Sequence, residues 1–373
     1  MSGCPRCGES LEAGHQFCVH CGRPLEEEPP VGPCTECAVS EGRGHRFCVR
    51  CGRPVGRATD AAGRSPAAVI VGIAGLSVTA VCALLLPLDL LALAISYADI
   101  FQNLYHSIYQ VNLWLPVRIF LFDLSGPSLQ AYFVLITIGV AASVAYILLR
   151  SADVMRKEPT AEGAKRTPLY SVCTLTFAAA AFQVGFFLLA ALFGQGTGYE
   201  PEIDQWKLMF GLLNASIFEE INDRVFLLGL PMLILVVVAR RKAMPLWRYV
   251  VGGFGVTPAA VVLILFSATM FGISHYESWG WVKVIPATAA GIAFGYLFVR
   301  FGLYAAVTAH FITDYMQSVL WLAPGAALPY GLLIIVLTAA GAVMLLQHSA
   351  MGLRFLADWR RKDFWTGEDV TTP

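Results

Sequence analysis

Three short motifs in the second half of the chain combine side chains that can do acid–base chemistry. In order along the chain they are Glu219-Glu220-x3-Arg224, Phe271-x3-His275 and His310-x3-Asp314. Two histidines and a glutamate are what the activation of water beside a peptide carbonyl requires: a base, and partners that hold the water or stabilise an oxyanion. The three motifs therefore predict one hydrolytic site.

The first motif contains neighbouring carboxylates that a helix would separate. Glu220 and Arg224 are four residues apart and share a helix face, which permits an ion pair, whereas Glu219 is turned about 100° away. One carboxylate can then be structural while the other stays available. The alternative is a loop or helix end at the membrane interface, because Gly229 and Pro231 follow closely and permit a break.

The other two motifs place a pair of residues four apart inside apolar segments. On a helix, Asp314 could orient the imidazole of His310 or join it as a ligand. The alternative for a single intramembrane histidine, including His275, is a hydrogen bond between helices. Two histidines and a carboxylate would also suit a catalytic divalent metal such as zinc with an open position. The chain has neither HExxH nor G-x-S-x-G, so a serine nucleophile has no support.

Eight of the ten cysteines form a tandem repeat near the N-terminus. The pattern C-x2-C-x10-C-x2-C occurs twice, offset by 30 residues, at Cys4, Cys7, Cys18, Cys21, Cys34, Cys37, Cys48 and Cys51. About 20 residues cannot bury a sufficient core, so each unit needs disulfides or a metal. Paired CxxC knuckles predict two structural zinc sites, with His15 and His45 as packing or surface residues. A disulfide framework is the alternative, but it requires export, and the N-terminus is hydrophilic and lacks a signal peptide.

The composition separates this polar head from a membrane body. Of 373 residues, 57% are hydrophobic and only 14% are charged, with mean hydropathy +0.63, whereas soluble domains carry about 25% charged residues. This excludes an ordinary cytosolic enzyme. Lys plus Arg equals Asp plus Glu, at 26 each, so no basic excess suggests nucleic-acid binding and none is expected.

The apolar segments predict an all-α, polytopic transmembrane helical bundle preceded by two small Cys4 zinc ribbons. About eight stretches approach the 20 residues that a bilayer core requires. They lie near 67–97, 128–150, 168–194, 206–240, 249–272, 283–300, 302–322 and 328–348. The aromatic segment from Asp99 to Phe122 carries several charges and is expected at the interface.

The basic residues predict the orientation. Arginines and lysines concentrate near 150–166, 240–248 and 354–362, whereas Gln195 to Trp206 has none. By the positive-inside rule, both termini and the head are cytoplasmic and the loop near Glu202 faces the other side. We expect an integral protein of a bacterial plasma membrane. The domains expected are zinc ribbon 1 (1–25), zinc ribbon 2 (31–55), a linker (56–66), an N-terminal transmembrane region (67–167), a transmembrane core that carries the three motifs (168–350) and a cytoplasmic tail (351–373).

The ordered set of motifs resembles the CPBP family of intramembrane proteases, also called the Abi or CAAX-protease family, over about residues 168–350. The resemblance implies peptide-bond hydrolysis in a membrane cavity, by a glutamate-dependent or a metal-dependent route. It implies these roles: Glu219 as general base, Glu220 and Arg224 in support, His275 and His310 positioning water or oxyanion, and Asp314 assisting. Many members have Asn where this chain has Asp314, so the position is anionic here. The head resembles the double zinc-ribbon modules of bacterial proteins.

The function expected is an intramembrane endopeptidase acting on a membrane-associated protein or peptide in the lipid bilayer. The zinc ribbons would recruit substrate or a cytoplasmic protein partner. Two alternatives remain. One is a non-enzymatic membrane scaffold or regulator that retains the protease fold. The other is a proton-coupled transporter, which would also use buried Glu, His and Asp but would favour an inverted repeat, and none is visible by eye.

Overall fold

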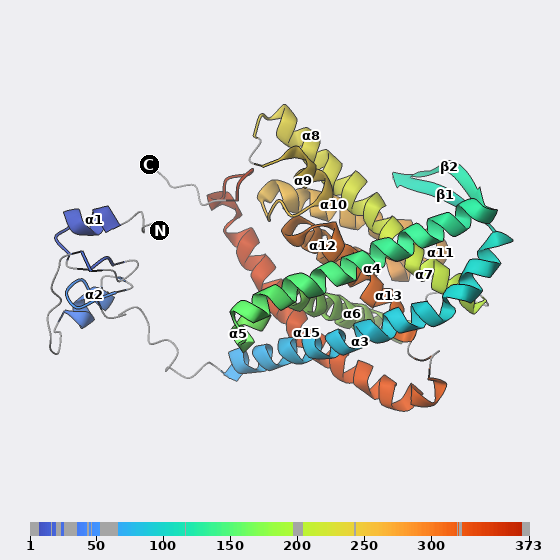
Figure 1. The fold of residues 1–373 in the computed structure, drawn as a ribbon, viewed down its shortest axis with the longest axis horizontal. Helices are drawn as coiled ribbons and strands as arrows, with labels where there is room; N and C mark the ends of the chain where they lie inside the picture. Colours follow the sequence, from blue (N-terminus) through green and yellow to red (C-terminus); the bar gives the residue numbers. More distant parts are fainter. Residues whose placement is uncertain are drawn as a thin grey trace. The chain divides into compact units, whose positions relative to one another are not determined.

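The fold is described from a computed structural model, in which the chain divides into a small N-terminal unit, Met1–Ile70, and a larger helical unit, Val71–Pro373 (Figure 1). The residues that the structure describes are 7–15, 17–19, 24–25, 36–42, 45, 47–52, 66–115, 117–196, 204–241, 244–318, 320 and 323–367.

In the small unit, the two cysteine repeats have the same local structure. Helices α1 (Cys7–Glu12) and α2 (Cys37–Gly42) begin at equivalent cysteines. In each repeat a serine hydroxyl, of Ser10 or Ser40, accepts a hydrogen bond from the backbone nine residues later, at 3.4 and 3.3 Å. The rings of His15 and His45 pack together with centroids 5.5 Å apart, which confirms the expectation of packing residues.

In its described residues, the larger unit consists of helices and one β-hairpin. In order, the elements are α3 (Pro66–Tyr105), β1 (Ile108–Leu115), β2 (Val117–Ser125), α4 (Gly126–Lys157), α5 (Ala161–Lys165), α6 (Pro168–Leu192), α7 (Gln205–Glu220), the π-helix η1 (Ile221–Gly229), α8 (Leu230–Val238), α9 (Leu246–Val251), α10 (Pro258–Ser274), α11 (Tyr276–Trp279), α12 (Trp281–Phe301), α13 (Leu303–Tyr315), the 3-10 turns η2 (Met316–Ser318) and η3 (Pro324–Ala326), α15 (Ala327–Ala357) and η4 (Trp359–Arg361).

The predicted helical membrane bundle is confirmed, but the expected number of spans needs correction. Among the described residues, seven helices are long and apolar enough to cross a membrane, where about eight were expected. The exception is the stretch 302–322, whose helix α13 has 13 residues. At 1.5 Å per residue it covers about 20 Å of the roughly 30 Å hydrocarbon core. Helix length alone therefore does not indicate that the chain crosses the membrane an even number of times.

Two hydrogen bonds lie just beyond the end of helix α13, where the chain passes into η2. The Tyr330 hydroxyl donates to the Met316 carbonyl, and the Ser318 hydroxyl donates to the Asp89 carboxylate of α3 at 3.5 Å. Along its length α13 is almost entirely buried. It is thus the helix that the others surround, which suits it to carry His310 and Asp314.

The segment expected at the interface forms the hairpin. Strands β1 and β2 pair in antiparallel register from Ile108 opposite Ser125 to Leu115 opposite Val117, with an irregularity at Val111 and Asn112. The hairpin joins the ends of α3 and α4 (Figure 1). The first helix also runs further than expected, since α3 continues to Tyr105.

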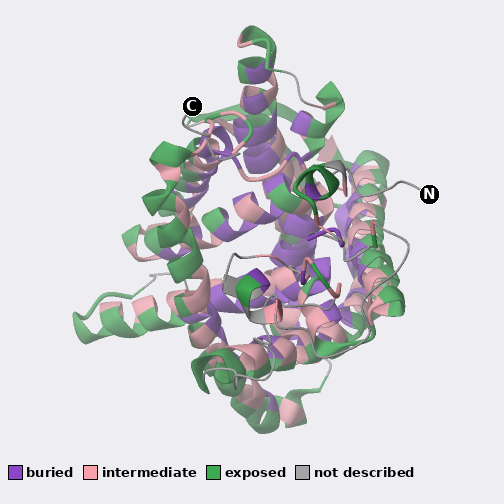
Figure 2. Cartoon of the chain, turned by 90° about the vertical axis from the view of Figure 1, so that its left-hand side faces the viewer, coloured by how far each residue is buried: buried purple, intermediate pink, exposed green. Residues whose placement is uncertain are grey.

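Close helix packing surrounds the site. Helices α6 and α10 begin at Thr-Pro pairs, in which Thr167 and Thr257 accept a backbone N–H three residues later at 3.1 Å. A Cβ at Gly272 would lie 2.6 Å from the carbonyl oxygen of Val284, so only glycine lets α10 and α12 approach this closely. Buried residues concentrate in the interior of the helical unit and exposed ones outside (Figure 2). Many exposed residues are large and apolar, such as Leu84 and Leu192, as expected for surfaces facing lipid.

Candidate active site

The first motif lies inside one long apolar helical segment. Residues Gln205–Val238 form one candidate span, in which α7 passes into η1 directly after Glu220. Glu220 and Arg224 are fully buried and lie on a continuous helical segment, so the alternative of a loop is wrong. A Cβ at Gly229 would lie 2.6 Å from the Val250 carbonyl oxygen, so α9 packs directly on the π-helix. π-Helices are rare and often occur at functional sites.

The predicted ion pair between Glu220 and Arg224 is present. Nε of Arg224 lies 3.1 Å from Oε2 of Glu220, with both side chains inaccessible to solvent. Nη1 of Arg224 donates to the Ser267 hydroxyl at 2.6 Å, and this hydroxyl donates to the Asp223 carbonyl at 2.7 Å. The guanidinium group also lies over the Phe271 ring, 5.3 Å from its centroid. The first motif is thereby attached to α10.

His310 lies among three carboxylates. Its Nδ1 is 2.9 Å from Oε1 of Glu220, while its Nε2 is 3.8 Å from Oε2 of Glu219 and 3.4 Å from Oδ2 of Asp314. Its ring stacks on Phe294, with centroids 5.0 Å apart. If Glu220 is ionised it can only accept, so Nδ1 carries the hydrogen of that bond and Nε2 faces the other two carboxylates.

An aromatic ring lies between His275 and His310. The ring centroid of His275 lies 4.8 Å from that of Phe271, which in turn is 5.9 Å from the ring of His310. Nδ1 of His275 is 2.8 Å from the Phe271 carbonyl oxygen, an acceptor, so Nδ1 carries the hydrogen. In the neutral ring, Nε2 is then an acceptor and offers no hydrogen to an oxyanion.

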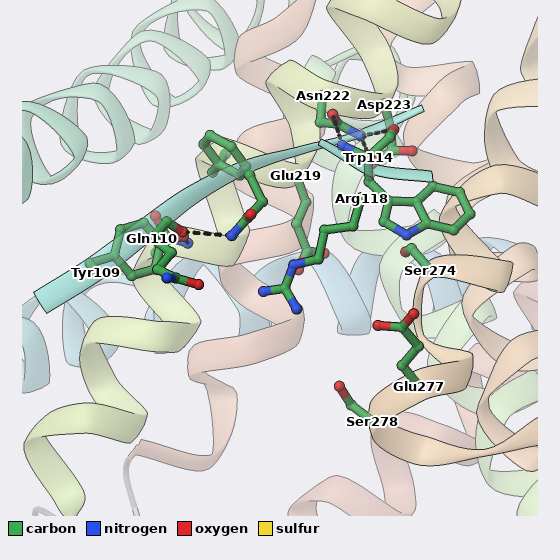
Figure 3. Close-up of a pocket in the computed structure, with 13 residues that line it drawn as sticks. Tyr109, Gln110, Trp114, Arg118, Glu219, Asn222, Asp223, Ser274, Glu277 and Ser278 are labelled. Atoms are coloured by element: carbon green, nitrogen blue, oxygen red, sulfur yellow. Dashed lines mark hydrogen bonds between the residues drawn. The ribbon is translucent and has the colours of Figure 1, made fainter. Parts of the chain in front are cut away.

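A cavity of about 260 Å³ lies beside Glu219. Its lining comprises Tyr109, Gln110, Asn112, Trp114, Arg118, Asn214, Phe218, Glu219, Asn222, Asp223, Ser274, Glu277 and Ser278. Figure 3 shows Arg118 extending from the hairpin into this cavity, and in this view Glu219 lies between Tyr109 and Glu277. The side chain of Glu219 is 35% exposed, whereas that of Glu220 is 0% exposed. Of the two carboxylates, Glu219 is the one that a solute in the cavity can reach.

Two asparagines fasten the hairpin to the helix that carries the first motif. Oδ1 of Asn222 accepts from the backbone N–H of Trp114, and its Nδ2 donates to the Trp114 carbonyl, both at 3.1 Å. Asn214 lies between the hydroxyls of Tyr132 and Tyr109, at 2.5 and 2.8 Å. One wall of the cavity is therefore held in a fixed position.

Sequence reasoning missed this wall. The five hairpin residues and Asn214 were not expected at the site. Burial raises the pKa of Tyr109; the hydrogen bond from Asn214 lowers this pKa and the charge of Glu219 raises it. The phenol therefore keeps its proton at neutral pH. A signal was present in the alternation of polar Gln110 and Asn112 with apolar Val111 and Leu113, which is typical of a strand.

The cysteine cluster fits a metal. The Sγ atoms of Cys37, Cys48 and Cys51 lie within 4.8 Å of one another, and those of Cys37 and Cys51 are 3.6 Å apart. Tetrahedral zinc with Zn–S bonds of about 2.3 Å separates its sulfurs by roughly 3.8 Å. Of the other five predicted ligands, Cys7 and Cys18 belong to the first repeat, where Cys18 is buried. Cys4, Cys21 and Cys34 lie outside the described residues.

The intramembrane cluster fits a preformed metal cage less well. In the described ranges, the cysteine group is the one set of three metal-binding side chains with donor atoms this close. Glu219, His310 and Asp314 do not meet the same limit.

Two protein families match parts of the chain. Residues 201–316 match the family described as Type II CAAX prenyl endopeptidase Rce1-like, and residues 4–52 match the double zinc ribbon. These matches confirm the resemblance on both counts and support a CAAX-type intramembrane protease with a zinc-binding head. Among curated proteins and among solved structures, nothing matches the chain. The hairpin, at 108–125, lies outside both matched segments.

Proposed function

We propose that the chain is an intramembrane endopeptidase that hydrolyses a peptide bond of a membrane-associated protein or peptide, with water activated by Glu219. The observation that carries this proposal is the contrast between the two glutamates. Glu220 is fully buried and neutralised by Arg224, while Glu219 borders the cavity without a cation within ion-pair distance in the described residues, His310 apart. A base must be able to reach its water, and Glu219 can.

The reaction follows from these positions. Glu219 accepts a proton from water, and the resulting hydroxide forms a bond to the carbonyl carbon of the substrate, whose oxygen becomes negatively charged. The carbon–nitrogen bond then breaks, and the proton passes from Glu219 to the leaving amine. Water adds across the bond, and the products are a carboxylic acid and an amine.

The remaining motif residues hold the water and the base. His310 is fixed through Nδ1 by Glu220, so its Nε2 stays directed at Glu219 and at the water beside it. Asp314 borders the same nitrogen on another side. Arg224 keeps Glu220 ionised and in place. His275 supports the ring of Phe271, against which His310 also packs.

The test compares four variants. We expect Glu219→Gln to abolish the cleavage of particular proteins in comparative membrane proteomics, because loss of a general base costs about 10² to 10⁴ in rate. Glu158→Gln, at an exposed ion pair with Arg166, is the matched control and should cleave normally. Glu220→Gln should lose activity together with thermal stability. Unchanged proteomes for both Glu219→Gln and His310→Ala would favour the non-enzymatic scaffold.

We also propose that the zinc head is cytoplasmic and recruits substrate or a protein partner there. The arginines and lysines near 150–166 support this orientation. A cysteine probe near Lys165 should react with an impermeant reagent only after the membrane is permeabilised, whereas one near Glu202 should react from outside. The reverse pattern would refute the orientation.

A further inference from the structure

The proposed hydrolysis lacks one component among the motif residues. Attack on a peptide carbonyl leaves a negative charge on its oxygen, and preorganised hydrogen-bond donors usually stabilise this charge. The Nδ1–H group of His275 is engaged by the Phe271 carbonyl, and that of His310 by Glu220. Nε2 of His310 faces the carboxylates of Glu219 and Asp314, so a hydrogen on it is directed at them. A donor from elsewhere in the cavity would supply the contact to the oxyanion.

Tyr109 has a hydroxyl whose hydrogen is directed by its neighbours. The Tyr132 hydroxyl lies 2.5 Å from Asn214, a separation normal for O–H to oxygen and short for N–H to oxygen, so Tyr132 donates to Oδ1 of Asn214. The amide nitrogen of Asn214 then donates to the Tyr109 oxygen at 2.8 Å. Since Tyr109 already accepts this bond, its own hydrogen has no acceptor among the described residues and is available to the cavity.

The ring of Tyr109 is also held in place. It stacks on Tyr132, with centroids 6.0 Å apart, and meets Phe210 edge to face at 5.6 Å. A donor that is already oriented need not be reorganised during the reaction, which is the source of its catalytic value. Arg118 and Gln110 also line the cavity, but both side chains extend from exposed strand positions.

We propose that Tyr109 is a further catalytic residue, whose hydroxyl donates a hydrogen bond to the oxyanion formed when water attacks the substrate, with Asn214 and Tyr132 as its positioning residues. This inference rests on the proposed function. It places part of the catalytic machinery on the hairpin, outside the segment that matches the protease family.

The test uses the full-length protein in lipid vesicles and a fluorogenic peptide copied from the cleavage site that depends on Glu219. Tyr109→Phe removes only the hydroxyl, and we expect kcat to fall by about 10² to 10³ with little change in KM. Tyr146→Phe on α4, whose ring packs on Tyr304 away from the cavity, is the matched control and should be normal.

Asn214→Asp separates catalysis from support of the hairpin. A carboxylate at this position can only accept, so the Tyr109 hydroxyl would turn toward it and its hydrogen would leave the cavity. A catalytic hydroxyl predicts a loss of kcat as large as in Tyr109→Phe. A merely structural hydroxyl predicts near-normal kcat, because the bond between the two side chains persists.

The pH profile provides a second readout. Because burial raises the pKa of Tyr109, its phenol stays protonated to higher pH than an exposed tyrosine and remains a donor at neutral pH. Tyr109→Phe should therefore lower the whole profile without removing either limb.

The outcomes are distinct. If Glu219→Gln abolishes cleavage while Tyr109→Phe and Asn214→Asp keep normal kcat, the inference is overturned and the proposed function stands. If Glu219→Gln cleaves normally, the proposed function itself fails. Should Tyr109→Phe not fold, the Asn214→Asp result decides.

Discussion

In the small N-terminal unit, three cysteine sulfurs lie within 4.8 Å of one another, and a metal bound there would do the stabilising work that a hydrophobic core does in a larger domain. The helical unit instead buries a continuous apolar cluster and, within it, an ionic network around Arg224. A unit that depends on a few metal ligands should lose its fold all at once. A unit held by many contacts should lose stability in graded steps, according to the group removed.

The largest effect is expected in the head. Structural zinc contributes about 10 to 16 kcal/mol to the folding of small zinc domains, so Cys48→Ser should unfold the second ribbon. We expect two zinc ions per wild-type chain and one in this variant, by elemental analysis of the full-length protein. Cys173→Ser, at a buried thiol of α6, is the control and should keep both. Equal zinc content in all three proteins would contradict the metal-dependent head.

A smaller effect is expected from Arg224→Ala in the helical unit. This variant leaves Glu220 buried without its cation, which typically costs about 3 to 5 kcal/mol. Yield and thermal stability in detergent should fall, together with activity. Arg248→Ala, at an exposed cation over Trp247, should leave the melting temperature nearly unchanged. A normal melting temperature for Arg224→Ala would mean that the network is not essential to the fold.

The smallest effect is expected from Tyr315→Phe. The Tyr315 hydroxyl donates to the Met209 carbonyl at 2.7 Å and ties α13 to α7. Loss of one such bond costs about 0.5 to 1.5 kcal/mol. The melting temperature should fall slightly, whereas Tyr276→Phe at an exposed position should not change it. A fall in melting temperature as large as that of Arg224→Ala would show that the helical unit does not lose stability in graded steps.

Local spacing was sufficient to predict part of this arrangement. The pairing of Glu220 with Arg224, leaving Glu219 apart, follows from four-residue spacing on one helical segment. The tandem zinc head follows from the cysteine pattern and from its repeat of 30 residues, and the family match confirms it. Each of these features depends on residues close together in the sequence.

Features that depend on distant contacts could not be predicted in this way. The π-helix after Glu220 lies where α9 packs on Gly229, and α13 ends at Tyr315 although apolar residues continue beyond it. The hairpin turn at Leu115 to Val117 lacks the Asn-Gly or Asp-Gly pair that usually marks one. The position of the hairpin depends on its hydrogen bond to Asn222, more than 100 residues further along the chain.

The fastening of the hairpin by Asn214 and Asn222 limits which piece of this protein can be transplanted. One wall of the cavity comes from the hairpin at 108–125 and the other from residues 214–278. The domain boundary expected at residue 167 would therefore separate the two walls. A graft of 201–316 into another membrane scaffold would carry the acid–base cluster and both asparagines, whose amides would then meet lipid or an unrelated backbone. Exchange of segments between related proteins should succeed only when the hairpin and the helix that carries the first motif are transferred together.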